Sequence, residues 1–338
     1  MAFVSKRENM KKIAIAGMGV AGSFLLRLLL QRGYAPDSID CFEVKQKTAC
    51  GIAPCAFGVA KRQFVDILKN VDLDATNYIL STFYRIYIDD TATGCYLCTI
   101  DKPRLLKDLI GKHPVKILDS EERIDTSQYD LVVDATGYKR VYLPPIENDL
   151  IIPTIQYKIK TEEYLPLRID HVGIGYGWIF PLADNEYHIG MGCLKCNLME
   201  RFKELYGDII SRCRNEVICG CKSYVRLLPP RYAIPIVHKS IVGVGEAAGT
   251  VAPLCGAGII ASMESALLLS ENIEDIHGYE RAMLKHFRYL NKEFKVLRKM
   301  MDGKEPNLID VIRLLPNSRR VGLFAKLGTS LKLRKGVC

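Results

Sequence analysis

The chain has 338 residues, of which 49% are hydrophobic and 25% charged, with a formal net charge of +9. This composition is typical of a globular protein and excludes a disordered one, and the length predicts two lobes or one domain with a large insertion. No apolar run approaches the ~18 residues of a membrane-spanning helix. The amino terminus lacks the apolar core of a signal peptide, so we expect a cytoplasmic protein.

The first predicted elements are a strand, a glycine-rich turn and a helix. The apolar residues Ile13–Ala16 predict a buried strand, and residues 23–32 predict a helix packed on a sheet. Gly17, Gly19 and Gly22 lie between them with the spacing G-x-G-x-x-G, in the context that a dinucleotide site requires. The first glycine permits a tight turn, the second lets a pyrophosphate approach the backbone, and the third lets helix and strand pack closely. The helix N-terminus then faces the phosphates.

The next predicted strand, at residues 39–44, ends in an acidic residue. Glu43 is well placed there to accept hydrogen bonds from a ribose. Together with the glycines, both strands and the helix, it indicates a dinucleotide site. The alternative is a glycine turn in an ordinary α/β core.

Further elements follow in chain order. We predict a loop at 50–59, a helix at 61–68, strands at 84–89 and 94–100, a helix at 105–110 opened by residues 101–104, and a strand from 129 that ends in the small-residue turn 135–137. That turn returns to the carboxyl edge of the parallel sheet, where ligands bind. The middle of the chain predicts an antiparallel sheet, a natural wall for a substrate pocket, from strands at 155–159, 172–180 and 187–192, followed by a helix at 199–210.

A second strand leads into a second glycine turn. Residues 240–249 predict a strand and a turn that presents Glu246, and residues 253–259 open the apolar helix 260–269. The N-terminus of that helix carries about half a positive charge, which suits the anionic edge of a reduced flavin. A nicotinamide enzyme has no need of this element, so the sequence favours FAD over NAD. A second G-x-G-x-x-G after a strand is missing, which argues against a separate nicotinamide domain. One amphipathic, basic helix is predicted at 279–301.

Twelve cysteines are many for a cytoplasmic protein. Close pairs occur at Cys95 and Cys98, at Cys193 and Cys196, and at Cys219 and Cys221. The run from residue 193 through 213 to 221 leaves an iron–sulfur or zinc centre as an alternative. The spacings fit no standard ligand set, and small buried residues or the disulfides of a hyperthermophile are favoured. We therefore predict no metal site.

The motifs taken together resemble known flavoproteins. Residues 17–22 with Glu43, then 135–137, then 245–249 and 253–259 follow the order found in FAD enzymes of the para-hydroxybenzoate hydroxylase type. Residues 175–181, GYGWIFP, resemble the more specific Y-x-W-x-F-P motif of the geranylgeranyl reductase family. Residues 187–192 resemble the glycine-ending strand that follows it there, and residues 55–58 resemble the family's C-x-x-G loop beside the flavin.

The resemblance implies an α/β fold in which a Rossmann-type FAD-binding domain, a parallel sheet with helices, is joined to an antiparallel-sheet substrate domain and C-terminal helices. We assign residues 1–150 and 222–275 to a discontinuous FAD-binding domain, 151–221 to the substrate domain, and 276–338 to a helical, basic segment. The resemblance further implies a monomeric or weakly associated FAD-dependent oxidoreductase. The activity that the resemblance implies is the saturation of carbon–carbon double bonds in isoprenoid (geranylgeranyl) chains, in archaeal membrane-lipid or quinone precursors.

The resemblance also assigns residues to the cofactor. The FAD site contains Gly17, Gly19, Val20, Ala21, Gly22, Glu43, Val44, Cys55, Ala56, Gly58, Lys102, Arg104, Ala135, Thr136, Gly137, Gly245, Glu246, Pro253, Gly256, Gly258 and Ile259. Three positions depart from the family pattern. Lys102, or Arg104 two residues on, stands for the usual arginine, Glu246 for the usual aspartate, and Cys255 for a frequent threonine. The chain is also shorter than most members, so we expect a trimmed substrate lobe.

The substrate pocket is assigned to Tyr176, Trp178, Phe180 and Pro181. In an extended strand the three aromatic residues point to one face and would line an apolar tunnel; the alternative is that they are ordinary core aromatics. Cys55 is the candidate proton donor beside the flavin, the alternative being a small packing residue. Cys50 and Cys255 are candidate partners for it in a redox switch, and a structural role is favoured for His188.

The segment after Asp302 interleaves basic and apolar residues, which suits the surface of an anionic membrane. A solvated helix face is the alternative, and no nucleic-acid motif accompanies the charge. Two other functions remain open on the same scaffold: an oxygen-using hydroxylase or non-redox isoprenoid cyclase, and a flavin electron carrier that docks a partner. The electron donor, NAD(P)H or ferredoxin, is not specified by the sequence.

Overall fold

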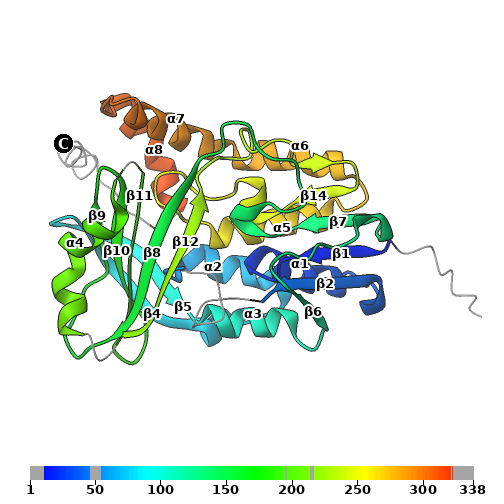
Figure 1. The fold of residues 1–338 in the computed structure, drawn as a ribbon, viewed down its shortest axis with the longest axis horizontal. Helices are drawn as coiled ribbons and strands as arrows, with labels where there is room; N and C mark the ends of the chain where they lie inside the picture. The colour runs from blue at the N-terminus through cyan, green and yellow to red at the C-terminus, as the bar shows by residue number, and fades with distance from the viewer. Residues whose placement is uncertain (1–10, 46–54, 195, 214–216, 321, 323–338) are drawn as a thin grey trace, which may run out of the picture.

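The computed structural model describes residues 11–45, 55–194, 196–213, 217–320 and 322. They form two sheets that lie side by side, with helices packed on both (Figure 1). The α/β class, with a parallel sheet, an antiparallel sheet and C-terminal helices, is confirmed. No helix in this part of the chain combines the length and the apolar character needed to cross a bilayer.

The six-stranded sheet has the strand order β13-β14-β7-β1-β2-β6. Its strands are β1 (Ile13–Ala16), β2 (Ile39–Val44), β6 (Val115–Leu118), β7 (Leu131–Asp134), β13 (Val237–His238) and β14 (Ile241–Gly243). All neighbours are parallel except β13 and β14. Strand β1 is buried on both faces, and its sequence is accordingly apolar at every position, as is typical of strands in parallel sheets.

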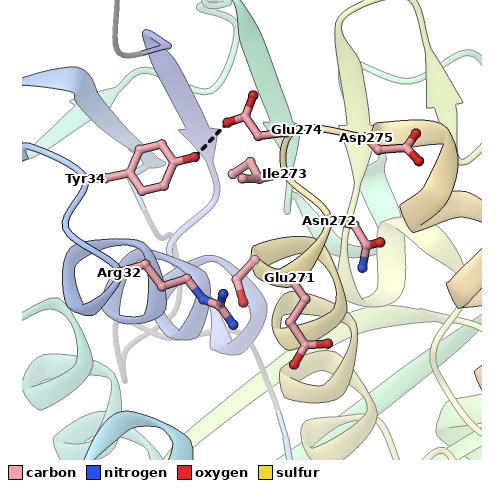
Figure 2. A pocket seen from close by; sticks show the side chains of 8 residues that line it. Arg32, Tyr34, Glu271, Asn272, Ile273, Glu274 and Asp275 are labelled. Carbon is pink, nitrogen blue, oxygen red and sulfur yellow. Dashed lines mark hydrogen bonds between the residues drawn. The ribbon is translucent and has the colours of Figure 1, made fainter. Parts of the chain in front are cut away.

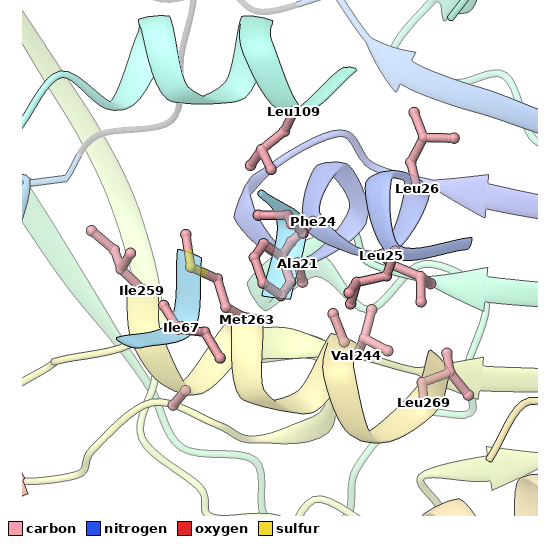
Figure 3. Close-up of a cluster of buried hydrophobic side chains, with 14 of the residues drawn as sticks. Ala21, Phe24, Leu25, Leu26, Ile67, Leu109, Val244, Ile259, Met263 and Leu269 are labelled. Carbon is pink, nitrogen blue, oxygen red and sulfur yellow. The ribbon is translucent and has the colours of Figure 1, made fainter. Parts of the chain in front are cut away.

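Helices α1 (Val20–Gln31), α3 (Lys102–Ile110) and α5 (Ile259–Glu271) pack around this sheet and form its main core with α2 (Lys61–Leu68). Phe24 and Leu25 of α1, Met263 of α5 and Val244 belong to one buried cluster, part of which is drawn in Figure 3. The close packing of α1 and α5 brings the first and the second glycine turns to the same end of the sheet.

The eight-stranded sheet has the order β12-β8-β11-β10-β9-β4-β5-β3. Its strands are β3 (Gly58–Ala60), β4 (Ile79–Ile88), β5 (Thr91–Ile100), β8 (Ile151–Lys160), β9 (Arg168–His171), β10 (Ile174–Pro181), β11 (Glu186–Leu194) and β12 (Val217–Arg226). All pairs are antiparallel except β4 with β9. Helix α4 (Leu198–Arg212) covers its outer face through Phe202 and Tyr206 (Figure 1).

Sheet membership crosses the domain boundaries predicted from the sequence. Strands β3, β4 and β5 lie within the residues assigned to the FAD-binding domain, yet they pair in the eight-stranded sheet. Strand β12 extends the same sheet to Arg226. The cause is the parallel pairing of β4 with β9, a contact between distant segments that no local pattern reveals.

The strand predicted at 172–180 corresponds to β10, which begins at Ile174 because Gly173, with φ +51°, turns the chain between β9 and β10. Another predicted element is divided in the structure. The helix predicted at 279–301 is two helices, α6 (Ile276–His286) and α7 (Leu290–Met301), joined by the 3₁₀ turn Phe287–Tyr289. Phe287 and Leu290 stay buried across the turn, so the apolar pattern continues although the helix does not.

The C-terminal helices cover one end of the molecule. Helix α7 packs Phe294 and Leu297 on the segment after β12, and α8 (Leu308–Arg320) lies against α7 (Figure 1). The predicted tail beyond residue 322 lies outside the described residues.

Candidate active site

The first glycine turn has the close backbone contacts that its motif predicts. Gly17 adopts φ +96° and donates its N–H to the Phe42 carbonyl at 2.8 Å. A Cβ on Gly17 would lie 2.5 Å from the Ala135 oxygen, and one on Gly22 would lie 2.0 Å from the Gly17 oxygen. A Cβ on Gly19 would meet no atom within 4 Å. The turn therefore leaves open space at Gly19, at the N-terminus of α1, where Val20 and Ala21 begin the helix.

Glu43 lies over this turn at the end of β2. Its two carboxylate oxygens accept hydrogen bonds of 2.8 Å from the N–H groups of Met18 and Val44. These bonds fix the carboxylate beside the glycine turn. The predicted contact with a ribose remains a prediction.

The turn after β7 packs against the first one. Asp134 is fully buried and its oxygens accept bonds from Thr136, Tyr142 and Leu143. Gly137 follows with φ +67°. The sequence analysis did not predict this role for Asp134, although its position at the end of an apolar strand is a signal that could have indicated it.

The second glycine turn meets the first. Gly245, with φ +63°, donates its N–H to Ser265 Oγ at 2.8 Å, and a Cβ on it would lie 2.9 Å from the Ala21 Cβ. A Cβ on Gly137 would lie 3.3 Å from Glu246 Oε2. Pro253 and Gly256 lie in the turn that follows, and Gly258 and Ile259 start α5. The structure thus brings together the turns predicted to share one site.

Glu246 is held in this cluster by Arg226. The backbone N–H of Arg226 donates to Glu246 Oε1 at 2.8 Å. The buried guanidinium of Arg226 forms an ion pair with Asp149 at 2.9 Å. Burial raises the pKa of Glu246 to about 7, against the opposing influence of Arg226 and Lys102. Arg226 was missed because nothing in its strand pattern marks it as buried.

Lys102 and Arg104 are separated by their places on α3. Lys102 is buried, with its Nζ 5.9 Å from the centre of the Phe57 ring, and no ion pair is found for it among the described residues. The Arg104 guanidinium is exposed over the Tyr78 ring. Of the two candidates, Lys102 is therefore the one that lies at the site.

His188 differs from the satisfied structural histidine that the sequence favours. It is 4% exposed, and its Nδ1 has no hydrogen-bond partner in the described part of the chain. Its ring lies 4.6 Å from the Phe57 ring, edge to face. Burial lowers the pKa of His188 to about 4, helped by the charges of Lys158 and Lys102. The imidazole is therefore neutral at pH 7.

These two pKa shifts act on stability with opposite signs. In the folded protein the pKa of Glu246 is about 7, above its ordinary value of 4.5. The contribution of Glu246 to the free energy of unfolding is therefore present at acid pH and is lost as the pH rises toward 7. The pKa of His188 in the folded protein is about 4, below its ordinary value of 6.5. Its contribution to the free energy of unfolding is therefore present above pH 6.5 and is lost as the pH falls toward 4. Each shift corresponds to at most about 3 kcal/mol.

We expect the two groups to be separable by substitution in the ligand-free protein. Relative to wild type, the free energy of unfolding of Glu246→Gln should rise between pH 4.5 and pH 7, and that of His188→Gln should fall between pH 4 and pH 6.5. Urea denaturation at a series of pH values measures both differences. Differences that do not change with pH would contradict the burial of these groups.

The aromatic residues of β10 share the inner face of the eight-stranded sheet. Tyr176 and Trp178 lie 5.8 Å apart between ring centres, while the intervening Gly177 faces α4, where a Cβ would lie 2.4 Å from the Tyr206 hydroxyl. Ile179 likewise joins the core under α4. The predicted common face of Tyr176, Trp178 and Phe180 follows from this alternation.

Glycines allow these rings to lie on neighbouring backbone. Trp178 pairs with Gly190 of β11, and a Cβ there would lie 2.4 Å from the indole. A Cβ on Gly58 would lie 2.1 Å from the Phe180 ring. The predicted flavin loop, from Cys55 to Gly58, therefore packs directly against the predicted substrate strand. The Pro181 carbonyl instead accepts a bond from Thr99 and ties β10 to β5.

Tyr176 connects the strand to the loop before α5. Its hydroxyl donates a hydrogen bond to the Cys255 carbonyl, and a Cβ on Gly256 would lie 2.4 Å from that hydroxyl. Burial raises the pKa of Tyr176 far above its ordinary value, and burial raises the pKa of Cys255 to about 12. Both groups therefore stay protonated at physiological pH.

Gln156 of β8 links the other half of this face. Trp178 Nε1 donates to Gln156 Oε1 at 3.3 Å, and Gln156 Nε2 donates to the Cys55 carbonyl at 3.2 Å. Gln156 is 5% exposed. The sequence analysis missed this residue, because a single polar side chain in a predicted strand gives no sign of where the strand pairs.

The cysteines include one disulfide and several buried free thiols, the two roles that the sequence favours. Cys193 and Cys196 form a disulfide, and no cluster of three or more metal-ligating side chains is found within the described ranges. Cys55 and Cys255 both lie near the Tyr176 ring. Cys50, the other candidate for a redox switch, lies outside the described residues.

A surface cavity of about 350 Å³ lies elsewhere, beside the C-terminal ends of α1 and α5 (Figure 2). Arg32, Tyr34 and Glu274 are among its lining residues, and the Tyr34 hydroxyl donates to Glu274 at 2.9 Å. None of the predicted site residues lines this cavity. The glycine turns lie at the opposite ends of these helices.

Comparisons with known proteins agree with this geometry. No family model matches the chain. An uncharacterised protein of Methanocaldococcus jannaschii is 28% identical over 90% of this chain and 94% of its own length. A solved structure of a geranylgeranyl bacteriochlorophyll reductase-like protein from Thermoplasma acidophilum has a TM-score of 0.68 at 18% identity, covering 95% of each chain.

Two further solved structures are similar over most of the chain. PqsL, a probable FAD-dependent monooxygenase from Pseudomonas aeruginosa, has a TM-score of 0.58 at 14% identity, covering 86% of this chain and 97% of its own. HpxO from Klebsiella pneumoniae, solved with FAD, has a TM-score of 0.59 at 16% identity, covering 86% of this chain and 89% of its own. At these identities the similarity shows the fold: the chain has the fold of the FAD-dependent oxidoreductases.

Proposed function

We propose that the chain is an FAD-dependent reductase that saturates carbon–carbon double bonds of isoprenoid chains, in membrane-lipid or quinone precursors. The observation that carries the proposal is the aromatic face of β10, which packs against the loops at residues 55–58 and 255–256. An apolar chain requires an apolar wall, and this wall adjoins the loop that leads into α5.

The residues at the glycine turns fit FAD. A pyrophosphate fits the open space at Gly19, where the first amides of α1 point outward. The buried Lys102 ammonium has no carboxylate partner among the described residues and suits an anionic group of the cofactor. Glu43 would hold the adenosine ribose, and the start of α5 would face the flavin ring. Bound and reduced, FAD supplies the hydride that an alkene carbon receives.

The chain itself must supply the proton for the other alkene carbon. The Tyr176 phenol is protonated, half-buried and oriented by its hydrogen bond to the Cys255 carbonyl, which makes it the first candidate donor. The neutral Cys255 thiol and Cys55 lie close to the same ring. An apolar chain bound against these half-buried aromatic side chains would exclude water from this face and suppress competing proton transfers.

A flavin monooxygenase is the second candidate, because PqsL, a probable FAD-dependent monooxygenase, shares the fold. The two functions differ in their product: a reductase adds two hydrogen atoms to each bond, and a monooxygenase adds one oxygen atom. We expect lipids from cells that express the chain to gain mass in steps of two hydrogens. A gain of oxygen would support the monooxygenase, and unchanged lipids with reversible flavin reduction would support an electron carrier.

We expect Trp178→Ala to weaken isoprenoid reduction without releasing the cofactor. Loss of the indole removes apolar contact area from the wall and should raise KM on the order of tenfold. Trp178→Phe keeps a ring against Gly190 but loses the hydrogen bond to Gln156. Its KM should lie between that of the wild type and that of Trp178→Ala. Steady-state kinetics and flavin absorbance measure the two effects. Joint loss of flavin and folding would assign Trp178 to the core instead.

A further inference from the structure

Helix α8 carries an apolar stripe on its outer face. Leu308, Ile309 and Ile312 are 45%, 57% and 50% exposed, and Pro316 is exposed one turn further on. Residues 308, 312 and 316 follow one another at intervals of four, so they form a single line along the helix. Large apolar side chains gathered on one exposed helix face mark an interaction surface.

The opposite face of α8 is fixed to the protein. Asn317 is buried and its Nδ2 donates to Glu293 Oε1 at 2.9 Å and to the Tyr289 carbonyl at 3.1 Å. Asp310 is buried and pairs with Lys299 at 2.7 Å. The helix is therefore held in one orientation, and the apolar stripe points away from the protein.

Basic residues flank the stripe. Arg313 and Arg320 are exposed on the same side, and the Arg320 guanidinium lies 4.4 Å from the centre of the Tyr289 ring. The sequence continues with Lys326, Lys332, Arg334 and Lys335, in a chain of net charge +9. An apolar stripe bordered by cationic side chains matches the boundary between anionic lipid headgroups and acyl chains.

We propose that α8 docks the protein onto an anionic lipid bilayer through Leu308, Ile309 and Ile312, with Arg313 and Arg320 at the headgroups. A second copy of the chain fits less well, because three apolar side chains on one helix fall far short of the ~800 Å² per partner in a stable dimer, and because like charges would meet. The proposal rests on the helix alone and does not depend on the proposed activity.

Docking at α8 would place the bilayer close to the candidate site. Asn317 binds Glu293, and the other Glu293 oxygen accepts the Leu254 N–H at 3.4 Å, next to Cys255. These contacts also decide the design of the test. Truncation after Asp302 removes Asn317 and leaves the buried Glu293 carboxylate with fewer partners, so point substitutions on the exposed stripe are the cleaner choice.

The experiment is co-sedimentation of the full-length protein with phosphatidylcholine vesicles that contain or lack phosphatidylglycerol. We expect binding to the anionic vesicles and release by high salt, because surface attraction is screened. Ile312→Glu should lower the partition coefficient about tenfold, and Arg313→Glu about fivefold or more. Ile117→Glu, on β6 and 62% exposed, is the matched control and should bind as wild type does.

Three results would overturn the proposal. They are the absence of wild-type binding to anionic vesicles, equal binding by Ile312→Glu, and equal loss in Ile117→Glu. A dimer that Ile312→Glu dissociates, seen by analytical ultracentrifugation without vesicle binding, would assign the stripe to self-association. Circular dichroism of each variant confirms that the comparison is between folded proteins.

Discussion

Gly19→Val should leave the protein folded and abolish flavin binding. Gly19 has φ −70° and ψ −166°, a conformation that valine adopts readily, and a Cβ at this position meets no protein atom within 4 Å. The side chain would instead fill the space that a pyrophosphate needs. We expect FAD affinity to fall by roughly a hundredfold or more, measured by flavin absorbance of the purified protein and by titration of the ligand-free form.

The neighbouring glycine provides the contrast. A Cβ on Gly22 would lie 2.0 Å from the Gly17 oxygen, so Gly22→Val should destabilise the fold itself, by about 3 kcal/mol or more. Thermal unfolding distinguishes the two variants. Wild-type flavin content in Gly19→Val would contradict the assignment of the first glycine turn to the cofactor.

Tyr176→Phe should lower the rate of double-bond reduction about a hundredfold, the usual cost of removing a general acid. The substitution keeps the ring against Trp178 and removes only the hydroxyl that Cys255 holds. Flavin content should stay unchanged. Single-turnover kinetics under anaerobic conditions separate this chemical step from substrate binding.

Tyr206→Phe is the matched control for Tyr176→Phe. Tyr206 belongs to α4 and packs on the outer face of the same sheet, and its hydroxyl donates to Asp170 at 2.8 Å. Its loss should cost about 1–3 kcal/mol of stability and leave the rate of reduction unchanged. If both variants kept the wild-type rate, the proton would have to come from another group, with Cys55 and Cys255 the nearest candidates.

Local patterns predicted the elements that are defined by local contacts. The bounds of β2 and α2 agree with the sequence prediction, because an apolar strand and an amphipathic helix each show their own period. The common face of Tyr176 and Trp178 follows in the same way from strand alternation. The glycine turns were predictable because only glycine tolerates such close backbone approach, as at Gly22.

Features that depend on distant pairing were not predictable. Strand β4 joins the eight-stranded sheet through β9, about eighty residues further along the chain. Gln156, Arg226 and Glu293 are polar residues buried by tertiary contacts, and their local sequence resembles that of exposed positions. The choice between Lys102 and Arg104 also needed the structure, because the orientation of α3 decides which side chain is buried.

The central claim, reduction of an isoprenoid double bond, is tested most directly by the mass of the product. Protein reduced chemically under anaerobic conditions is mixed with a geranylgeranylated lipid precursor, and the extracted product is analysed by mass spectrometry. The account predicts a product heavier by two hydrogen atoms for each bond reduced, with matching reoxidation of the flavin. A substrate that stays unchanged without oxygen and gains one oxygen atom in air would contradict it.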